Sequence, residues 1–153
     1  MKNKKEPKVL FVSASGGHFE QLLMLKPLME KYPSITVTEK TSINNKADYH
    51  MLQTGHKDKL FVIKMFLNLI KAIIIWVKEK PKFVVSTGTS IVFPFALLAK
   101  ITGSKIIYIE TFARVNDKTR TGAVMYKYAD LFIIQWESLQ EIYPNAVYGG
   151  SIY

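Results

Sequence analysis

Residues 9–12 form an apolar strand pattern that leads into Gly16 and Gly17 and then into an amphipathic helical pattern. A strand that passes through glycines into a helix leaves backbone N–H groups free at the turn, which suits a phosphate or diphosphate. The plain alternative is a tight turn that binds nothing. Ser15, Gly16 and Gly17 are therefore candidate diphosphate-binding residues. His18 opens the helix and is a candidate for acid–base catalysis, with capping or packing as its alternative.

The length of 153 residues and the hydrophobic share of 48% predict one domain with its own core. The absence of cysteine excludes disulfides and thiolate metal sites. The histidines have no carboxylate or histidine at ligand spacing, so no metal site is predicted. The lysine-rich segment 1–8 passes directly into the first strand pattern without a signal peptide, and we expect the chain to stay in the cytoplasm.

The chain is basic, with 21 Lys and Arg against 12 Asp and Glu and a formal net charge of +9. Such an excess favours an anionic partner. Nucleic acid is disfavoured, because the basic residues are spread out and no RNA-binding signature, zinc knuckle or recognition helix is present. An anionic membrane surface fits better.

Apolar runs of strand length alternate with helical patterns along the whole sequence. We expect strands at 8–13, 35–39, 83–86, 105–109, 131–135 and 146–148. Helices are expected at 18–31, 60–80, 89–101, 121–129 and 136–142. This alternation is typical of an α/β fold with a Rossmann-like, doubly wound parallel sheet, which binds ligands at the carboxyl ends of its strands. The polar segment 40–59 is expected to be a loop.

Two later turns follow strands as the first one does. Thr87, Gly88 and Thr89 are candidates to bind sugar or diphosphate oxygens. The alternative for this turn is that Thr89 or Ser90 only caps the helix that follows. Glu110 stands directly at a strand end, where it can act as a base or accept a sugar hydroxyl, and Arg114 can clamp a phosphate. The alternative for these two residues is a mutual ion pair that orders the loop.

The segment 60–80 has nearly the length of a membrane span, but charged residues near its middle make a span too costly. Its polar residues fall on one stripe at helical spacing: Lys64, Asn68, Lys71 and Lys78. The minimum interpretation is a crossover helix whose apolar face packs on the sheet while the lysines meet solvent. The other is an interfacial helix, with Trp76 at headgroup level and the three lysines facing anionic lipid. Both hold if the sheet covers only part of the apolar face.

Five motifs together resemble one family: SASGGH at 13–18, TEKT at 38–41, STG at 86–88, ETFARV at 110–115 and VYGGS at 147–151. They resemble the PssD-type proteins of bacterial exopolysaccharide and capsule assembly, and the membrane-recruiting subunit of the eukaryotic split N-acetylglucosaminyltransferase. The likeness covers nearly the whole chain. It implies the N-terminal, acceptor-side half of a GT-B glycosyltransferase, whose donor-binding catalytic half is a separate subunit.

The resemblance also implies roles for residues. By likeness to the single-chain relative MurG, Gly16, Gly17 and His18 would face the diphosphate of a polyprenyl-diphosphate-linked sugar, and Glu110 would position or activate this acceptor. The nucleotide sugar would belong to the partner subunit, and this chain would bind no cofactor. The eukaryotic subunit has an N-terminal membrane anchor where this sequence has segment 1–8. Peripheral attachment at the cytoplasmic face of the plasma membrane is therefore expected through 60–80.

Two other functions stay open at this point. A self-sufficient small α/β enzyme, such as a glycosyltransferase or nucleotide-sugar hydrolase, would use His18 and Glu110 directly. A purely structural membrane recruiter would need neither residue. The implied function lies between the two, because the chain would hold half of an active site and have little or no transferase activity alone.

Overall fold

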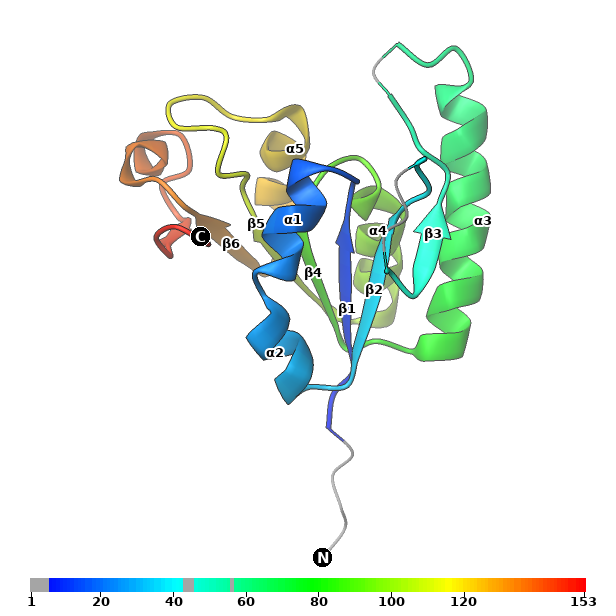
Figure 1. The fold of residues 1–153 in the computed structure, drawn as a ribbon. Helices are drawn as coiled ribbons and strands as arrows, with labels where there is room; N and C mark the ends of the chain where they lie inside the picture. Colours follow the sequence, from blue (N-terminus) through cyan, green and yellow to red (C-terminus); the bar gives the residue numbers. More distant parts are fainter. Residues whose placement is uncertain (1–5, 43–45, 56) are drawn as a thin grey trace, which may run out of the picture.

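The computed structural model describes residues 6–42, 46–55 and 57–153, which form a parallel sheet with helices on both faces (Figure 1). Within these residues the strand order is β3-β2-β1-β4-β5-β6-β7. The strands are β1 Val9–Ser13, β2 Ser34–Glu39, β3 Tyr49–Met51, β4 Phe83–Gly88, β5 Lys105–Ile109, β6 Leu131–Ile134 and β7 Val147–Tyr148. All six neighbouring pairs are parallel. The predicted doubly wound α/β fold is confirmed.

The helices form two layers. They are α1 Gly17–Leu23, α2 Lys26–Lys31, α3 Phe61–Glu79, α4 Val92–Thr102, α5 Arg120–Tyr128 and the 3-10 helix η1 Glu137–Glu141. One core cluster packs α1 and α2 against residues such as Phe11 and Val85, and the larger cluster packs α3, α4, α5 and η1 against the other face. The sheet order reverses between β1 and β4, so the turns that follow these two strands lie side by side.

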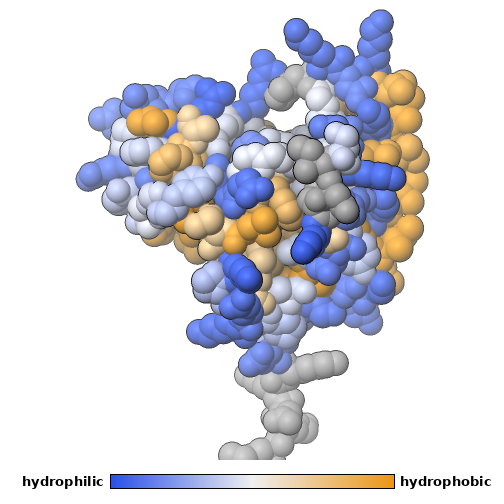
Figure 2. Space-filling view, in the orientation of Figure 1, coloured by the Kyte–Doolittle hydropathy of each residue, from blue (hydrophilic) through white to orange (hydrophobic). Residues whose placement is uncertain are grey.

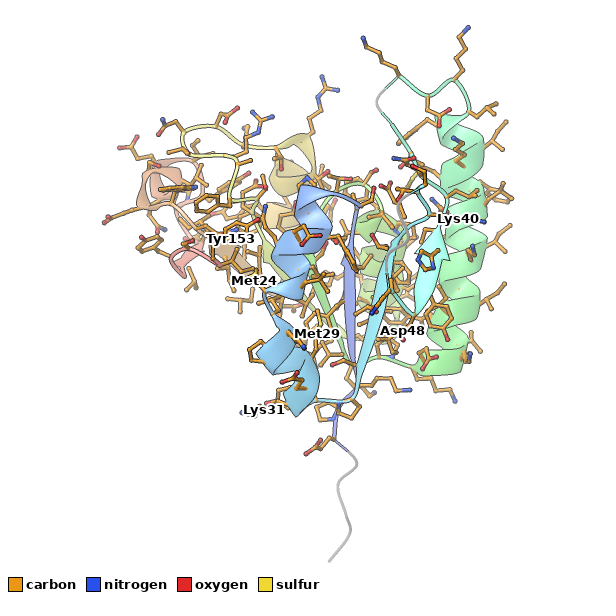
Figure 3. All side chains as sticks on the ribbon, in the orientation of Figure 1. Met24, Met29, Lys31, Lys40, Asp48 and Tyr153 are labelled. Atoms are coloured by element: carbon orange, nitrogen blue, oxygen red, sulfur yellow. The ribbon has the colours of Figure 1, made fainter. Side chains whose placement is uncertain are left out.

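The single helix predicted at 18–31 is two helices. The first ends before Met24, which Figure 3 labels at the break, and Pro27 lies in the first turn of the second helix. Proline has no N–H to donate, and its ring clashes with the carbonyl four residues earlier, so a continuous helix is disfavoured here.

The prediction of a loop throughout 40–59 is wrong, because β3 lies within it at the edge of the sheet. Helix α3 covers that edge. The buried Asn68 accepts a hydrogen bond from the Leu52 N–H at 2.8 Å and donates one to the Leu52 carbonyl at 2.9 Å. Lys71 donates to the His50 carbonyl at 2.6 Å and Lys64 to the Gln53 carbonyl at 3.3 Å. The polar stripe of α3 thus satisfies backbone groups that an edge strand leaves open.

The orientation of α3 corrects both interpretations of the segment 60–80. Lys64 and Lys71 of its polar stripe bond to carbonyls of the β3 segment. Trp76 is only 6% exposed and packs in the core, so it cannot lie at a lipid headgroup. The apolar side points outward instead and appears as the orange edge of Figure 2. The exposed apolar residues on α3 and the neighbouring α4 include Val62, Ile63, Phe66, Ile70, Ile74, Val77, Leu97 and Ile101, and we call this surface the α3 face. Among the described residues no helix is long and apolar enough to cross a membrane.

We predict that Asn68→Leu lowers the free energy of unfolding by about 1–3 kcal/mol, because the N–H and carbonyl of Leu52 both lose their partner. Ile74→Ala on the exposed side of the same helix is the control, and it should change stability by less than about 0.5 kcal/mol. Urea unfolding measures both. Equal, small effects would contradict the role assigned to Asn68.

Candidate functional site

The first and second turns meet through His18 and Thr87. The His18 Nδ1 lies 2.8 Å from the Thr87 carbonyl oxygen, and the buried Thr87 hydroxyl donates to the His18 carbonyl at 2.7 Å. A carbonyl only accepts, so Nδ1 carries the proton and Nε2 of the neutral ring is left as the acceptor. The half-buried His18 therefore has the tautomer and the fixed orientation that a general base requires.

Gly88 makes this close approach possible. Its φ of 108° lies in the left-handed region, and a Cβ at this position would stand 3.1 Å from both Cε1 and Nδ1 of His18. Thr89 is half-buried beside it. The alternative for this turn, capping of the next helix by Thr89 or Ser90, is wrong, because the N-cap of α4 is Ile91 and no side chain caps it.

The glycine turn after β1 presents open backbone. Gly16 and Gly17 are exposed, and a Cβ on either would meet nothing within 4 Å. Within the described part of the chain, no group accepts a hydrogen bond from the backbone N–H of Gly16, Gly17 or His18. A cavity of about 380 Å³ adjoins the turn, and its lining is Ser15, Gly16, Phe19, Glu20, Thr41, Ser42 and Gln53. The glycine turn and the cavity therefore offer hydrogen-bond donors to an anion or to a hydroxylated ligand.

Both hydrogen-bond donors of Ser15 are used within the protein, and its role in ligand binding stays a prediction. Its backbone N–H and its hydroxyl both donate to Glu39 Oε2, at 3.3 and 3.2 Å. The other Glu39 oxygen accepts from the Thr54 N–H at 3.2 Å, and Glu39 is only 4% exposed. This buried carboxylate ties the glycine turn to the segment after β3, a role that the sequence did not reveal.

Glu110 is fully buried, and its contacts all lie within the protein. Its carboxylate accepts from the Thr111 N–H at 3.0 Å, the Thr119 hydroxyl at 3.0 Å and the Tyr143 hydroxyl at 2.7 Å. A Cβ on Gly122 would stand 1.9 Å from it, so the start of α5 closes over the carboxylate. The prediction that Glu110 contacts the acceptor does not match this geometry, and we treat Glu110 as a positioning residue for the loop 111–119.

The tyrosine that donates to Glu110 stays protonated. Burial raises the pKa of the Tyr143 phenol, and its hydrogen bond to the Glu110 carboxylate raises it further. A role for Arg114 in clamping a phosphate stays a prediction, but the alternative, an ion pair with Glu110, is wrong. Arg114 forms an exposed ion pair with Asp117 rather than with Glu110, and such a pair contributes at most about 1 kcal/mol.

Two buried amides join this site to residues 149–153, which we call the C-terminal segment. Gln21 of α1 and Gln135 after β6 are 4% and 2% exposed, and they contact each other and the loop after β5. No group of three or more His, Cys, Asp or Glu side chains able to hold a metal ion occurs among the residues that the structure describes.

The parallel sheet, with its order reversed between β1 and β4, defines a Rossmann-like domain of the type found as the N-terminal domain of GT-B glycosyltransferases. The structure is similar to Acinetobacter baumannii MurG, with a TM-score of 0.68 and 15% identity, covering 86% of this chain and 42% of MurG. It is also similar to UDP-N-acetylglucosamine 2-epimerase from Rickettsia bellii, with a TM-score of 0.69 and 18% identity, over 89% of this chain and 40% of the epimerase. The chain thus spans about two fifths of these enzymes.

A family model described as oligosaccharide biosynthesis protein Alg14 like matches residues 37–152. The chain belongs to this Alg14-like family. Among curated relatives it is 28% identical to the UDP-N-acetylglucosamine transferase subunit ALG14 of Yarrowia lipolytica, over 94% of this chain and 80% of that protein. It is 27% identical to the human subunit of the same name, over 94% of this chain and 82% of the human protein.

We predict that Gly88→Ala displaces the His18 ring, because its new Cβ would lie too close to Cε1 and Nδ1. Gly103→Ala is a matched control: it also has a positive φ, of 74°, but nothing lies within 4 Å of the new Cβ. Both variants should lose about 1–3 kcal/mol of stability from backbone strain. Only Gly88→Ala should move the His18 ring signals in an NMR spectrum. Unchanged His18 signals in Gly88→Ala would refute the contact.

Proposed function

We propose that the chain is the acceptor-binding subunit of a membrane-associated glycosyltransferase and is inactive without a separate donor-binding subunit. Membership in the Alg14-like family and the names of the two relatives as transferase subunits support this proposal. The observation that carries it is the fixed His18 beside the open glycine turn, in a fold that spans 42% of MurG. In this proposal the chain supplies the acceptor half of an active site and a separate subunit supplies the donor half.

In this function His18 is the general base. Nε2 takes the proton of the acceptor hydroxyl while the oxygen forms a bond to the anomeric carbon of the donor sugar and the nucleotide diphosphate leaves. The Nδ1–H bond to the Thr87 carbonyl stabilises the imidazolium that results. The acceptor diphosphate lies against the free N–H groups of Gly16 and Gly17, and its sugar occupies the adjoining cavity, where Glu20, Thr41 and Gln53 offer hydrogen bonds.

The donor-binding catalytic subunit docks beside the C-terminal segment. Phe112, Trp136 and Tyr153 form an aromatic cluster there, with ring centroids 4.8 Å apart for Phe112 and Trp136 and 5.2 Å apart for Phe112 and Tyr153. Tyr153, labelled in Figure 3, is 59% exposed. Aromatic residues that are partly exposed around a polar site are typical of interface centres. The nucleotide sugar is held by that subunit, and this chain binds no cofactor.

The α3 face is the membrane-binding surface of this proposal, at the cytoplasmic side of the plasma membrane. Its apolar residues lie outward over nearly the whole helix, which is unusual for a surface without a partner. Exposed lysines flank it: Lys57 and Lys59 before α3, and Lys80 and Lys82 after it. An apolar helix face with cations at its ends is typical of interfacial helices on anionic lipid. Lys64 and Lys71 hold the β3 segment, while Lys78 is exposed and lies over the Tyr49 ring.

We further propose that the acceptor is a polyprenyl-diphosphate-linked sugar in the assembly of bacterial exopolysaccharide or capsule repeat units. The resemblance of the five sequence motifs to PssD-type proteins supports this process, while the family and the relatives support the coarser class of oligosaccharide biosynthesis. A host that lacks this protein should accumulate a lipid-linked oligosaccharide that is one sugar residue too short. Accumulation of a complete repeat unit instead would contradict this process.

The membrane role predicts that Phe66→Glu combined with Ile74→Glu reduces binding to anionic vesicles at least tenfold. Both side chains are more than half exposed. Burying one such apolar side chain in lipid stabilises the bound state by up to about 3 kcal/mol. Val124→Glu on α5 is the control, because Val124 is also an exposed apolar residue but lies outside the α3 face. Sedimentation with vesicles measures the binding. Equal binding of the double variant and the wild type would contradict the assignment.

Transfer to a lipid-linked acceptor tests the subunit role. The chain alone should be inactive, and activity should appear with the donor-binding subunit. In that complex His18→Ala should lower kcat by about 10²–10⁴-fold, as loss of a general base does.

Transfer by the chain alone would instead support the self-sufficient enzyme. A fully active complex with both His18→Ala and Glu110→Gln would support the structural recruiter.

A further inference from the structure

The amides of Gln21 and Gln135 form a buried bridge between α1 and the end of β6. The Gln135 Nε2 donates to the Gln21 Oε1 at 3.0 Å. Both side chains are almost fully buried, so each lost hydrogen bond here leaves a polar group without water. The mechanism proposed above uses neither residue.

Each amide is bonded at both of its ends. The Gln21 Oε1 also accepts from the Phe112 N–H at 3.0 Å, and its Nε2 donates to the Thr111 hydroxyl at 3.2 Å. The Gln135 Nε2 donates a second bond to the Glu110 carbonyl at 2.9 Å. The ends of strands β5 and β6 and helix α1 are thereby tied together.

The side-chain oxygen of Gln135 is the remaining polar atom of this bridge, and it contacts the C-terminal segment. The Gln135 Oε1 accepts from the Ile152 N–H at 2.9 Å. The direction of the amide follows from its partners, because a flipped Gln135 would place its oxygen against the two acceptors Gln21 Oε1 and Glu110 O. Gln135 therefore keeps its hydrogen bonds only when α1 and the C-terminal segment are both in place.

His18 lies one helical turn before Gln21 on α1, and the side chains of the two residues anchor that helix to different strands. His18 contacts Thr87 at the end of β4, and Gln21 contacts Thr111 and Phe112 after β5. Helix α1 has seven residues, so a shift at Gln21 moves the start of the helix as well. The aromatic ring of Phe112 in turn contacts Tyr153.

We propose that Gln135 is a positioning residue that couples the C-terminal segment to His18 through Gln21. A subunit that docks against the segment thereby favours the position of α1 in which His18 is aligned for proton transfer. This functional consequence rests on the proposed function, whereas the coupling itself rests only on the hydrogen bonds of the isolated chain.

The test separates the loss of one N–H from the loss of packing. Ile152→Pro removes the backbone N–H that donates to Gln135 Oε1. Ile152→Ala keeps this N–H and removes most of the side chain. In NMR spectra of the isolated chain, the His18 ring signals should shift in Ile152→Pro and in Gln135→Met. They should stay at their wild-type positions in Ile152→Ala.

Gln140→Met controls for stability. Gln140 also donates to backbone carbonyls, those of Tyr143, Pro144 and Ala146, but it contacts neither α1 nor the C-terminal segment. The Gln140→Met variant should have a lower free energy of unfolding, while its His18 ring signals stay at their wild-type positions. The proposal is overturned if the His18 signals are unchanged in Ile152→Pro and Gln135→Met, or if they move equally in Ile152→Ala or Gln140→Met.

A kinetic readout in the complex with the donor-binding subunit completes the test. Gln135→Met should lower kcat by about tenfold or more through misalignment of His18, with the KM for the nucleotide sugar unchanged. An unchanged kcat would overturn the functional consequence. If no complex transfers sugar while the His18 signals follow the expected pattern, the proposed function fails and the coupling stands.

Discussion

The side-chain amide of Asn68 determines how the largest helix lies on this protein. Because it pairs with both backbone groups of Leu52, the polar stripe of α3 must face the edge strand β3, and its apolar side must point outward. The reverse orientation would take these partners away from the N–H and carbonyl of Leu52 at the sheet edge, and it is disfavoured for that reason. The exposed α3 face is therefore a consequence of how the sheet edge is closed, and the proposed membrane attachment depends on it.

The crevice at the carboxyl ends of the strands is organised by buried polar groups that do not face a ligand. Glu39 holds the glycine turn, Glu110 holds the loop before α5, and the two buried glutamines join these parts to the C-terminal segment. Such buried, fully bonded networks make their surroundings rigid. What they leave accessible is the open backbone of Gly16 and Gly17 and the half-buried ring of His18, the set that an acceptor diphosphate and its hydroxyl need.

Periodicity and turn chemistry were enough to predict the fold class and six of the strands, because each of those strands is an apolar run bounded by polar residues. Strand β3 could not be predicted, since its three residues lie in a polar segment and depend on Asn68, a residue distant in sequence. The spacing in 60–80 correctly divided the helix into polar and apolar sides. It could not say which side faces the protein, because that depends on the unsatisfied edge of β3.

The candidate site was predicted in part for a similar reason. Strand ends identify where polar residues gather, so the contact of the His18 and Thr87 turns followed from the topology. Whether a carboxylate at a strand end turns inward depends on its surroundings. Glu110 turns inward because Thr119, Tyr143 and Gly122, all later in the chain, form its pocket. Gln135 stands at a strand end as the other polar turns do, but nothing in the sequence indicates that its amide is buried against Gln21, since a lone glutamine is usually exposed.

The account assigns acceptor binding to this chain and donor binding to another, and ligand binding by the chain alone tests that division most directly. The measurement is the change in the His18 ring NMR signals when a polyprenyl-diphosphate-linked sugar in lipid nanodiscs, or a soluble nucleotide sugar, is added without any second subunit. The account predicts that the lipid-linked sugar shifts these signals and that the nucleotide sugar does not. Saturable binding of the nucleotide sugar at His18, with no response to the lipid-linked sugar, would contradict it.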